Sequence, residues 1–353
     1  MGEVATGLEG IVVAETQLSS VDGERGVLIL RGERVEDLAG VCSFEAVLAR
    51  LHDRDDGDGW RERLGRARVE AAAHLVPSAA TDPMDALRAG LARLPESEDP
   101  AVLLGAGAVI VAAWDRQRRG LRAVAPDPDR GHAADLLALV RGEAPSPAAA
   151  AALDAYLVAV IDHGFNASTF TARVIASTGS DLVSACVGAV GALKGPLHGG
   201  APGPVLDMLD AVGAPERADD WVAAELAEGR RIMGMGHRVY RVRDPRAAVL
   251  ERALLTLDAA EPDPARAARL ALAKAVEEAA LTALRARHPE RELHANVEFY
   301  TALLLESLGL DRTLFPAVFA CARLGGWTAH VAEQKQGGRL IRPRARYVGA
   351  RPA

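Results

Sequence analysis

Histidine, arginine and acidic side chains stand in this sequence mostly at glycine-rich joints between apolar segments. The set comprises His163, His198, His237, Arg241, Asp244, Arg246, Glu298, Arg323 and Arg342. Glycine permits backbone conformations and close approaches that other residues cannot adopt, so such a joint can hold an imidazole beside exposed amides. Three histidines, one carboxylate base and several arginines together suit a small polyanionic acid that must be polarised at a carbonyl.

Each of these residues also has a purely structural interpretation. His163 ends an apolar helix, where its cation would interact favourably with the helix dipole. His198 lies in residues 193–200, a stretch that also has the pattern of a helix stop followed by a loop. Asp244-Pro245 is an ordinary helix start. Arg323 is different, because it lies within an apolar helix, where a guanidinium needs an anion or several acceptors.

A metal site is the competing use of the histidines and Glu298. No HxxxH or HExxH pair is present, so we expect no metal. Cys42, Cys186 and Cys321 lie far apart in apolar sequence, which indicates free thiols in a reducing compartment. We see no signal peptide and no apolar run long enough to span a membrane, and we expect a cytoplasmic protein.

The joints connect segments with the pattern of helices. Aromatic residues are only 4% of the chain, so the core must be mostly Ala, Leu and Val, which suits closely packed helices. Capping residues and prolines mark many of the starts. The predicted helices begin at 44 and span 83–94, 100–120, 147–163, 168–177, 181–193, 204–212, 218–228, 245–260, 264–286, 297–308 and 314–334.

One stretch near the N-terminus has a β pattern. Residues 17–21 and 27–30 flank a turn-rich linker, which predicts a hairpin. Residues 53–59 are acidic and contain glycine, and we expect a solvated loop there. The fold class is therefore mainly α, with a minor N-terminal hairpin. The formal net charge of −7 gives no reason to expect nucleic-acid binding, and no P-loop or dinucleotide-binding glycine motif is present.

Together these segments resemble the citrate synthase family, in its short bacterial and archaeal form. The matching stretches follow the family's order along most of the chain, although residues 53–66 fit poorly. They are GLEGIVV (7–13), DHGFNASTF (162–170), GALKGPLHGGA (191–201), RIMGMGHRVYRVRDPR (231–246), NVEFY (296–300), FACARLGGWTAHVAEQ (319–334) and LIRPRARYVG (340–349).

The resemblance implies an all-α fold in an intertwined homodimer, with no metal. A large domain would comprise residues 1–198 and 304–353, and a small domain residues 199–303. The active site would lie in the cleft between them. The family joins an acyl-CoA to a 2-oxo acid, which implies oxaloacetate and a coenzyme A thioester as substrates, no permanently bound cofactor, and a place in the tricarboxylic acid cycle.

The resemblance also assigns roles to the motif residues. His198 would donate a hydrogen bond to the thioester oxygen, and His237 would polarise the ketone of oxaloacetate. His163, Arg246 and Arg323 would bind oxaloacetate, and Arg342 would come from the neighbouring subunit. The coenzyme A contacts would come from Ile232, Met233, Gly234, Met235, Gly236 and Arg241.

Glu298 departs from the family pattern, which usually has aspartate as the base that takes the acetyl proton. Glutamate has a similar pKa but one more methylene. We favour a backbone set back to fit the longer side chain; a different acyl-CoA and a slower enzyme are the alternatives. The hypothesis is a citrate synthase that uses acetyl-CoA. Its alternatives are a 2-methylcitrate synthase that uses propionyl-CoA, and a non-catalytic paralogue that binds dicarboxylates or coenzyme A.

Overall fold

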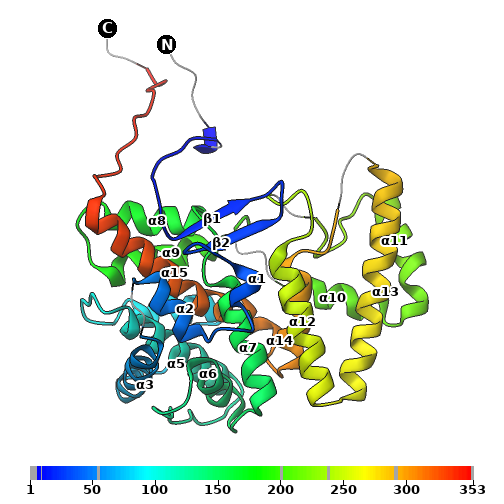
Figure 1. Ribbon diagram of the computed structural model, residues 1–353, viewed down its shortest axis with the longest axis horizontal. Helices are drawn as coiled ribbons and strands as arrows, with labels where there is room; N and C mark the ends of the chain where they lie inside the picture. Colours follow the sequence, from blue (N-terminus) through cyan, green and yellow to red (C-terminus); the bar gives the residue numbers. More distant parts are fainter. Residues whose placement is uncertain are drawn as a thin grey trace.

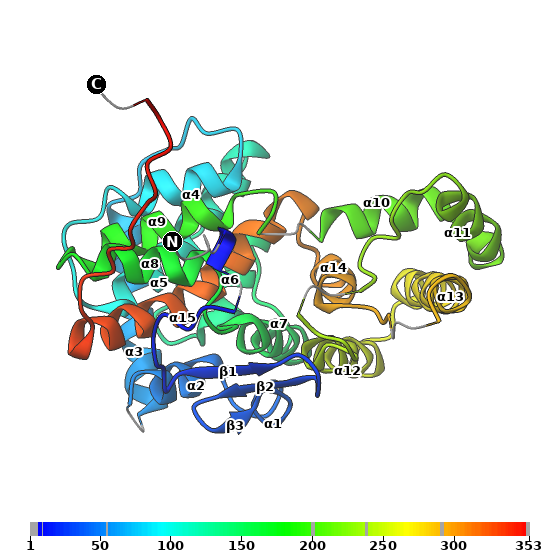
Figure 2. The same ribbon diagram turned by 90° about the horizontal axis from the view of Figure 1, so that it is seen from above.

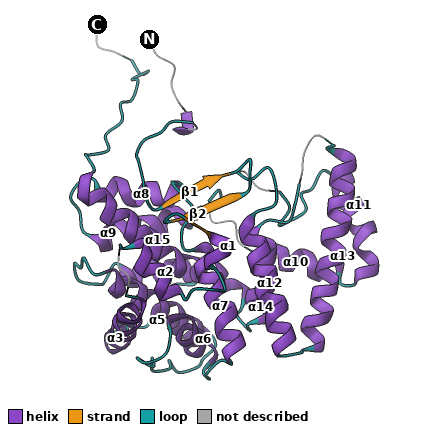
Figure 3. Ribbon diagram, in the orientation of Figure 1, coloured by secondary structure: helices purple, strands orange, loops and turns teal. Residues whose placement is uncertain are grey.

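The computed structural model describes residues 6–8, 10–53, 56–198, 202–236, 239–289 and 293–350. Helices dominate this part of the chain, and its strands form one small sheet (Figures 1 and 3). The mainly helical fold predicted from the sequence is confirmed. The helices are α1 (Val35–Leu38), α2 (Phe44–Leu51), α3 (Gly57–Ala73), α4 (Pro83–Leu91), α5 (Pro100–Arg118), α6 (His132–Arg141), α7 (Pro147–Val160), α8 (Ala167–Ala176), α9 (Leu182–Leu193), α10 (Gly203–Val212), α11 (Ala218–Ala227), α12 (Pro245–Ala260), α13 (Pro264–Arg287), α14 (Val297–Ser307) and α15 (Phe315–Gly337).

The sheet is antiparallel and has the order β1-β2-β3. β1 (Ser19–Asp22) pairs with β2 (Val27–Leu30), which confirms the predicted hairpin, and Ser19 lies opposite Leu30. The sequence did not reveal β3 (Glu33–Arg34), because two residues are too short for an alternating pattern. Leu28 and Leu30 are buried, so one face of the hairpin packs on the helices.

Short polar side chains cap many of the predicted helix starts. The Ser43 side chain accepts a hydrogen bond from the Ala46 amide at α2, and Ser146 does the same for Ala149 at α7. Aspartates followed by proline cap α4, α5 and α12. A cap satisfies amides that the helix itself leaves unpaired, and proline suits the first turn. This is why the sequence locates these starts closely.

The prediction of a solvated loop over residues 53–59 is wrong in its second half. α3 begins at Gly57, because Asp56 caps it by accepting a hydrogen bond from the Gly59 amide at 2.7 Å. The sequence pattern also failed to reveal the rest of α3 and α6. Arg68 of α3 and Asp135 of α6 are both fully buried, and Nε lies 2.7 Å from Oδ2. The charge on the buried face interrupts the apolar periodicity of α3, whereas α6 has apolar residues at helical spacing but begins after Gly131 without a side-chain cap.

Helix α15 lies at the centre of the larger helical group and packs against α5, α7, α8 and α9 (Figure 1). Most of its residues are buried, including every one from Ala320 to Val331. Gly326 allows the segment after α7 to lie directly against it, because a Cβ there would stand 2.5 Å from the Ile161 carbonyl oxygen and 2.7 Å from Asp162 Oδ1. The helix that fills the core therefore also fixes the chain around Asp162.

A second group of helices lies to one side. In Figures 1 and 2, α10, α11 and α13 are separated from the larger group by α12 and α14. α12 packs against α7, and α14 packs against both α12 and α10. Within the described ranges, no helix is both long and apolar enough to cross a membrane.

The contact between α3 and the connector at Pro128 generates a stability prediction. A Cβ added to Gly65 would lie 2.0 Å from the Pro128 carbonyl oxygen, which is backbone and cannot turn aside. We expect Gly65→Ala to lower the free energy of unfolding by about 1–3 kcal/mol, because overpacking forces the backbone to shift. Thermal and urea unfolding would measure the loss. The control is Gly191→Ala in α9, where a Cβ meets nothing within 4 Å; equal stability of the two variants would show that the Pro128 contact does not require glycine.

Candidate active site

His163 lies on a segment that buried contacts hold in place. α7 ends at Val160, so His163 does not cap that helix. The preceding residue, Asp162, is fully buried and accepts hydrogen bonds from the Ser19 hydroxyl and from Nε2 of His330. His163 Nε2 lies 3.0 Å from the hydroxyl of Tyr240, a buried residue distant in the sequence. Neither Asp162 nor Tyr240 was singled out from the sequence.

His198 directs one ring nitrogen at the start of α8. Its Nε2 accepts a hydrogen bond from the Ser168 amide at 3.1 Å and lies 2.8 Å from the Ser168 hydroxyl. A backbone N–H can only donate, so this bond assigns the proton of the neutral ring to Nδ1, which makes Nδ1 the donor of the ring. Burial, followed by the positive charge of Arg323, holds the pKa of His198 below its ordinary value. The side chain is therefore a neutral hydrogen-bond donor near pH 7.

Ser168 is itself held by two neighbours that sequence patterns did not reveal. Its hydroxyl has two acceptors for its proton, Asn166 Oδ1 at 2.8 Å and His198 Nε2, and it accepts from Nε1 of Trp327 at 3.2 Å. Asn166 also caps α8, accepting hydrogen bonds from the first amides of that helix. The types of these residues do not indicate a role in the site. Their role is visible only from their contacts around His198 in the folded chain.

Two buried arginines lie close enough for their like charges to interact. Arg246 is 3% exposed and Arg323 is 2% exposed. Arg246 donates two hydrogen bonds to Asp244, from Nε to Oδ1 at 3.0 Å and from Nη2 to Oδ2 at 2.7 Å. The only guanidinium hydrogen bond of Arg323 to a described residue runs from Nε to the Val160 carbonyl at 2.9 Å. Burial, opposed by Asp162 and reinforced by Arg246, lowers the pKa of Arg323 to about 10. An anion that bound both guanidinium groups would relieve their repulsion.

Glu298 stands in the first turn of α14, beside this pair. Asn296 caps the helix and accepts a hydrogen bond from the Glu298 amide at 3.0 Å. Burial raises the pKa of Glu298; the charge of Arg246 opposes this shift, and the charge of Asp244 adds to it. A half-buried carboxylate with a raised pKa suits a general base. Through these charge interactions Glu298 is coupled to Arg246, Arg246 to Arg323, and Arg323 to His198.

The predicted coenzyme A loop, residues 232–236, lies along the segment that leads into α14. The Asn296 amide donates to the Gly234 carbonyl at 2.9 Å, and the Gly236 amide donates to the His294 carbonyl at 2.8 Å. Gly234 has a φ of +74°, and a Cβ there would lie 2.9 Å from the Phe299 side chain. Only glycine suits that position. Within the loop, Ile232 is buried, Met233 is exposed, and Met235 forms a bridge to Ala295.

Besides the coenzyme A loop, two predicted site residues, Arg241 and Arg342, do not join the cluster, and His237 lies outside the described residues. Arg241 is exposed, with Nε 3.8 Å from Glu24 Oε1. Arg342 is exposed in the C-terminal tail, which leaves the body of the chain (Figure 1). The cluster therefore contains His163, His198, Arg246, Glu298 and Arg323.

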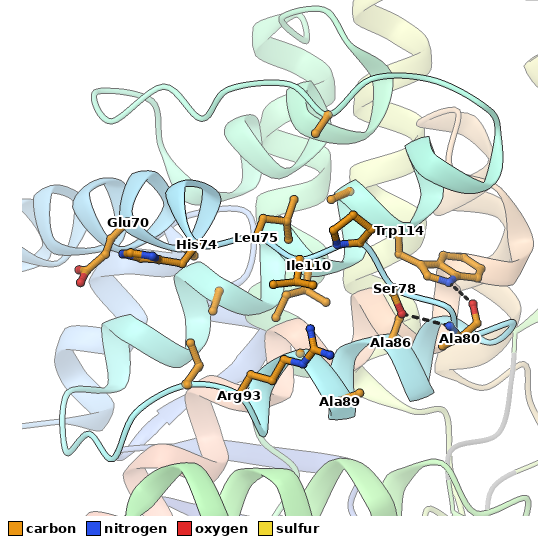
Figure 4. Close-up of a pocket in the computed structure, with 18 of the residues that line it drawn as sticks. Glu70, His74, Leu75, Ser78, Ala80, Ala86, Ala89, Arg93, Ile110 and Trp114 are labelled. Carbon is orange, nitrogen blue, oxygen red and sulfur yellow. Dashed lines mark hydrogen bonds between the residues drawn. The ribbon is translucent and has the colours of Figure 1, made fainter.

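A large cavity lies elsewhere in the described part of the chain. It has a volume of about 1150 Å³ and lies between the end of α3, α4 and α5, with His74, Arg93 and Trp114 in its lining (Figure 4). None of the predicted site residues lines it. In the part of the chain that the structure describes, no three His, Cys, Asp or Glu side chains are grouped so as to hold a metal ion.

Comparison with known proteins gives consistent matches over nearly the whole chain. The family model for the citrate synthase C-terminal domain matches residues 7–344. A citrate synthase of Haloferax volcanii is 37% identical over 99% of this chain and 96% of its own length. A 2-methylcitrate synthase of Mycobacterium tuberculosis is 36% identical over 98% of this chain and 91% of its own. A Thermoplasma acidophilum citrate synthase, solved with carboxymethyl coenzyme A and oxaloacetate, superposes with a TM-score of 0.86 at 26% identity, covering 100% of this chain and 98% of that chain.

The surroundings of His198 predict how it titrates. Burial and Arg323 both disfavour the imidazolium, so we expect protonation to occur below the usual pKa of about 6.5. Protein labelled with ¹⁵N-histidine would show the Nδ1–H tautomer at pH 7, with a midpoint displaced to lower pH. Arg323→Met, which removes the nearby charge, should move the midpoint back upwards. A midpoint at or above about 6.5 in the unsubstituted protein would contradict the assignment.

Proposed function

The chain belongs to the citrate synthase family, an acyltransferase family, and we propose that it condenses acetyl-CoA with oxaloacetate to give citrate and coenzyme A. The single observation that carries this proposal is the pair of buried arginines, Arg246 and Arg323, beside a neutral His198 and the carboxylate of Glu298. That arrangement supplies a dicarboxylate site, a hydrogen-bond donor for an oxyanion, and a base, all within one charge-coupled cluster.

Oxaloacetate binds first in this proposal. Arg246 and Arg323 bind its two carboxylates, and His163, oriented by Tyr240, donates to it. His237, assigned by family resemblance, polarises the ketone. Because Asp244 already holds Arg246 by two contacts, that guanidinium is fixed before the substrate arrives. Preorganisation of this kind reduces the free-energy cost of ordering the site during binding.

Glu298 and His198 act together on the thioester. Glu298 removes a proton from the acetyl methyl group, and the Nδ1–H of His198 donates to the thioester oxygen as it gains negative charge. The resulting carbon nucleophile attacks the ketone carbon of oxaloacetate, and the ketone oxygen gains a proton from His237. Water then cleaves the citryl thioester, which releases citrate and coenzyme A. No metal enters this scheme, and coenzyme A is a co-substrate.

The remaining assignments follow the family resemblance. We propose that the 232–236 loop and Arg241 contact coenzyme A. The division into a large domain (residues 1–198 and 304–353) and a small domain (residues 199–303) places this loop in the small domain. Closing the two domains over the substrates would exclude water before condensation.

We further propose a homodimer in which Arg342 completes the partner's site. The C-terminal tail supports this, because it carries exposed apolar residues, with Tyr347 64% and Val348 88% exposed. Apolar side chains on an extended tail suggest burial against another chain. Free thiols at Cys186 and Cys321 suit the reducing cytoplasm in which we place the enzyme, within the tricarboxylic acid cycle.

A second candidate activity is 2-methylcitrate synthesis from propionyl-CoA. The identity to a 2-methylcitrate synthase nearly equals that to a citrate synthase. Glu298 is longer than the aspartate usual in the family, and its position relative to the acyl group decides how well each thioester reacts. The non-catalytic alternative predicts binding of oxaloacetate without turnover.

An acyl-CoA panel tests the proposal. We expect purified protein to release free thiol from acetyl-CoA only when oxaloacetate is present, with kcat/KM higher for acetyl-CoA than for propionyl-CoA. One methylene discriminates by about 10–200-fold. A reversed preference would assign 2-methylcitrate synthesis, and no release from any short acyl-CoA would exclude the catalytic proposal.

Replacement of Glu298 tests its role as the base. Glu298→Gln keeps the size and removes the proton acceptor, so we expect kcat to fall by about 10²–10⁴-fold with an unchanged circular dichroism spectrum. Because the pKa of Glu298 is raised, activity of the unsubstituted enzyme should decline on acidification at a higher pH than for an ordinary glutamate. Glu298→Asp is the matched control, since it keeps the carboxylate. Full activity of Glu298→Gln would reject the assignment.

Mixed dimers test whether Arg342 acts on the partner subunit. We expect Arg342→Ala and His198→Ala to be nearly inactive as separate homodimers. A heterodimer of the two, isolated through different affinity tags, should regain about half of the activity, because one of its two sites has every residue intact. Absence of recovery would show that Arg342 serves its own chain or none.

A further inference from the structure

The N-terminal hairpin contacts two separate walls of the candidate site. One wall is the segment 162–164, which carries His163. The other is the segment 239–243, which carries Tyr240. These two segments meet where His163 Nε2 lies 3.0 Å from the Tyr240 hydroxyl. The hairpin of β1 and β2 was predicted from the sequence, but the proposed reaction gives it no role.

Strand β1 contacts the first wall. The Ser19 hydroxyl donates to Oδ2 of the buried Asp162 and accepts from the Gly164 amide at 3.1 Å. Gly164 has a φ of +64°, and a Cβ there would lie 3.2 Å from Val21 Cγ2. The residues on both sides of His163 are therefore held by one strand, Asp162 through its side chain and Gly164 through its backbone.

The turn of the hairpin contacts the second wall. The Arg241 amide donates to the Gly23 carbonyl at 2.8 Å. A Cβ on Gly23 would lie 2.2 Å from the Val239 carbonyl oxygen, and one on Gly26 would lie 2.6 Å from Val242 Cγ2. These approaches are closer than any side chain permits, so the turn and the 239–243 segment touch backbone to backbone.

Hydrogen bonds within the turn and between the strands make the hairpin rigid, so a displacement of one wall would also displace the other. Asp22 Oδ1 accepts hydrogen bonds from the Glu24 amide at 3.1 Å and the Arg25 amide at 3.0 Å, which fix the turn. The paired strands fix the register, with Asp22 opposite Val27. Figure 1 shows the hairpin extending from α15 towards the helices that follow the 239–243 segment.

We propose that the β1–β2 hairpin positions the oxaloacetate site by holding the two walls in register, with Gly23 as its critical positioning residue. This inference rests on the proposed function. The hairpin need not touch substrate: it acts through His163 and Tyr240, and the Tyr240 ring in turn lies 5.9 Å from the Arg246 guanidinium carbon. A displacement of about 1 Å at such groups is enough to weaken substrate interactions by one or two orders of magnitude.

Gly23→Ala is the direct test. Gly23 does not have a left-handed φ, so alanine there is not strained by its own backbone, and its effect comes from the Val239 contact. We expect KM for oxaloacetate to rise by about tenfold while kcat at saturation changes by less than about threefold, because substrate binding can restore the geometry. The thermal midpoint should also fall, as for Gly65→Ala, because the clash is again with a backbone oxygen; the kinetics are therefore measured well below that midpoint.

Arg25→Ala is the matched control in the same turn. The Arg25 side chain is 83% exposed and its ion pair with Asp22 is 3.9 Å long, so we expect unchanged kinetics. Should Gly23→Ala fail to fold, Ser19→Ala removes the hydroxyl at the other wall and should raise the same KM. An unchanged KM in a folded Gly23→Ala protein, or in Ser19→Ala if that is the variant that folds, overturns the proposal.

Hydrogen–deuterium exchange separates this inference from the proposed reaction. In Gly23→Ala, amides of residues 239–243 should exchange faster than in the unsubstituted protein, whether or not the protein turns over acyl-CoA. Unchanged exchange there would overturn the positioning role. Failure of the unsubstituted protein to release thiol would instead reject the proposed function, and the exchange result would still stand.

Discussion

The burial of two like charges next to each other is the constraint on which the site depends. A guanidinium in the interior loses its hydration, and a second one nearby adds repulsion. Aspartates near the two arginines offset this unfavourable free energy, and they lie at different distances from the guanidinium groups. Asp244 grips Arg246 directly, whereas Asp162 favours the charge of Arg323 without a hydrogen bond to it. Among the described residues, this difference leaves fewer hydrogen bonds on the Arg323 guanidinium than on that of Arg246, which suits the proposed binding of a dianion.

Two kinds of sequence signal differed in how accurately they predicted the elements of the fold. Motifs with a local physical cause were located well: the serine and aspartate caps begin helices as expected, and the hairpin forms over its predicted residues. Elements whose burial depends on contacts between residues distant in the sequence were not predicted. Arg68 of α3 is buried because it faces Asp135, so α3 showed no continuous apolar stripe; α6 has such a stripe but no capping residue to mark its start.

The site shows the same division. His198 and Glu298 were proposed as site residues from their motifs, and in the structure both interact electrostatically with the pair Arg246 and Arg323. Their supports were not found, because Ser168, Trp327 and Tyr240 are ordinary residues whose roles arise from contacts across the fold. The amide that fixes the tautomer of His198 is backbone, which carries no sequence signal at all.

The same turns of helix α15 contribute residues to the hydrophobic core and to the candidate active site. Arg323 is a proposed substrate ligand, Gly326 leaves room for Asp162, Trp327 donates a hydrogen bond to Ser168, and most of the other residues fill the interior. Its sequence is therefore doubly constrained, and a substitution selected for tighter packing there would alter catalysis as well. In an enzyme of this kind that adapts to higher temperature, stabilising substitutions would have to occur outside α15. Peripheral ion pairs such as those from Arg312 to Asp207 and Asp210 are free to vary, whereas this helix should accept the fewest changes as the molecule evolves.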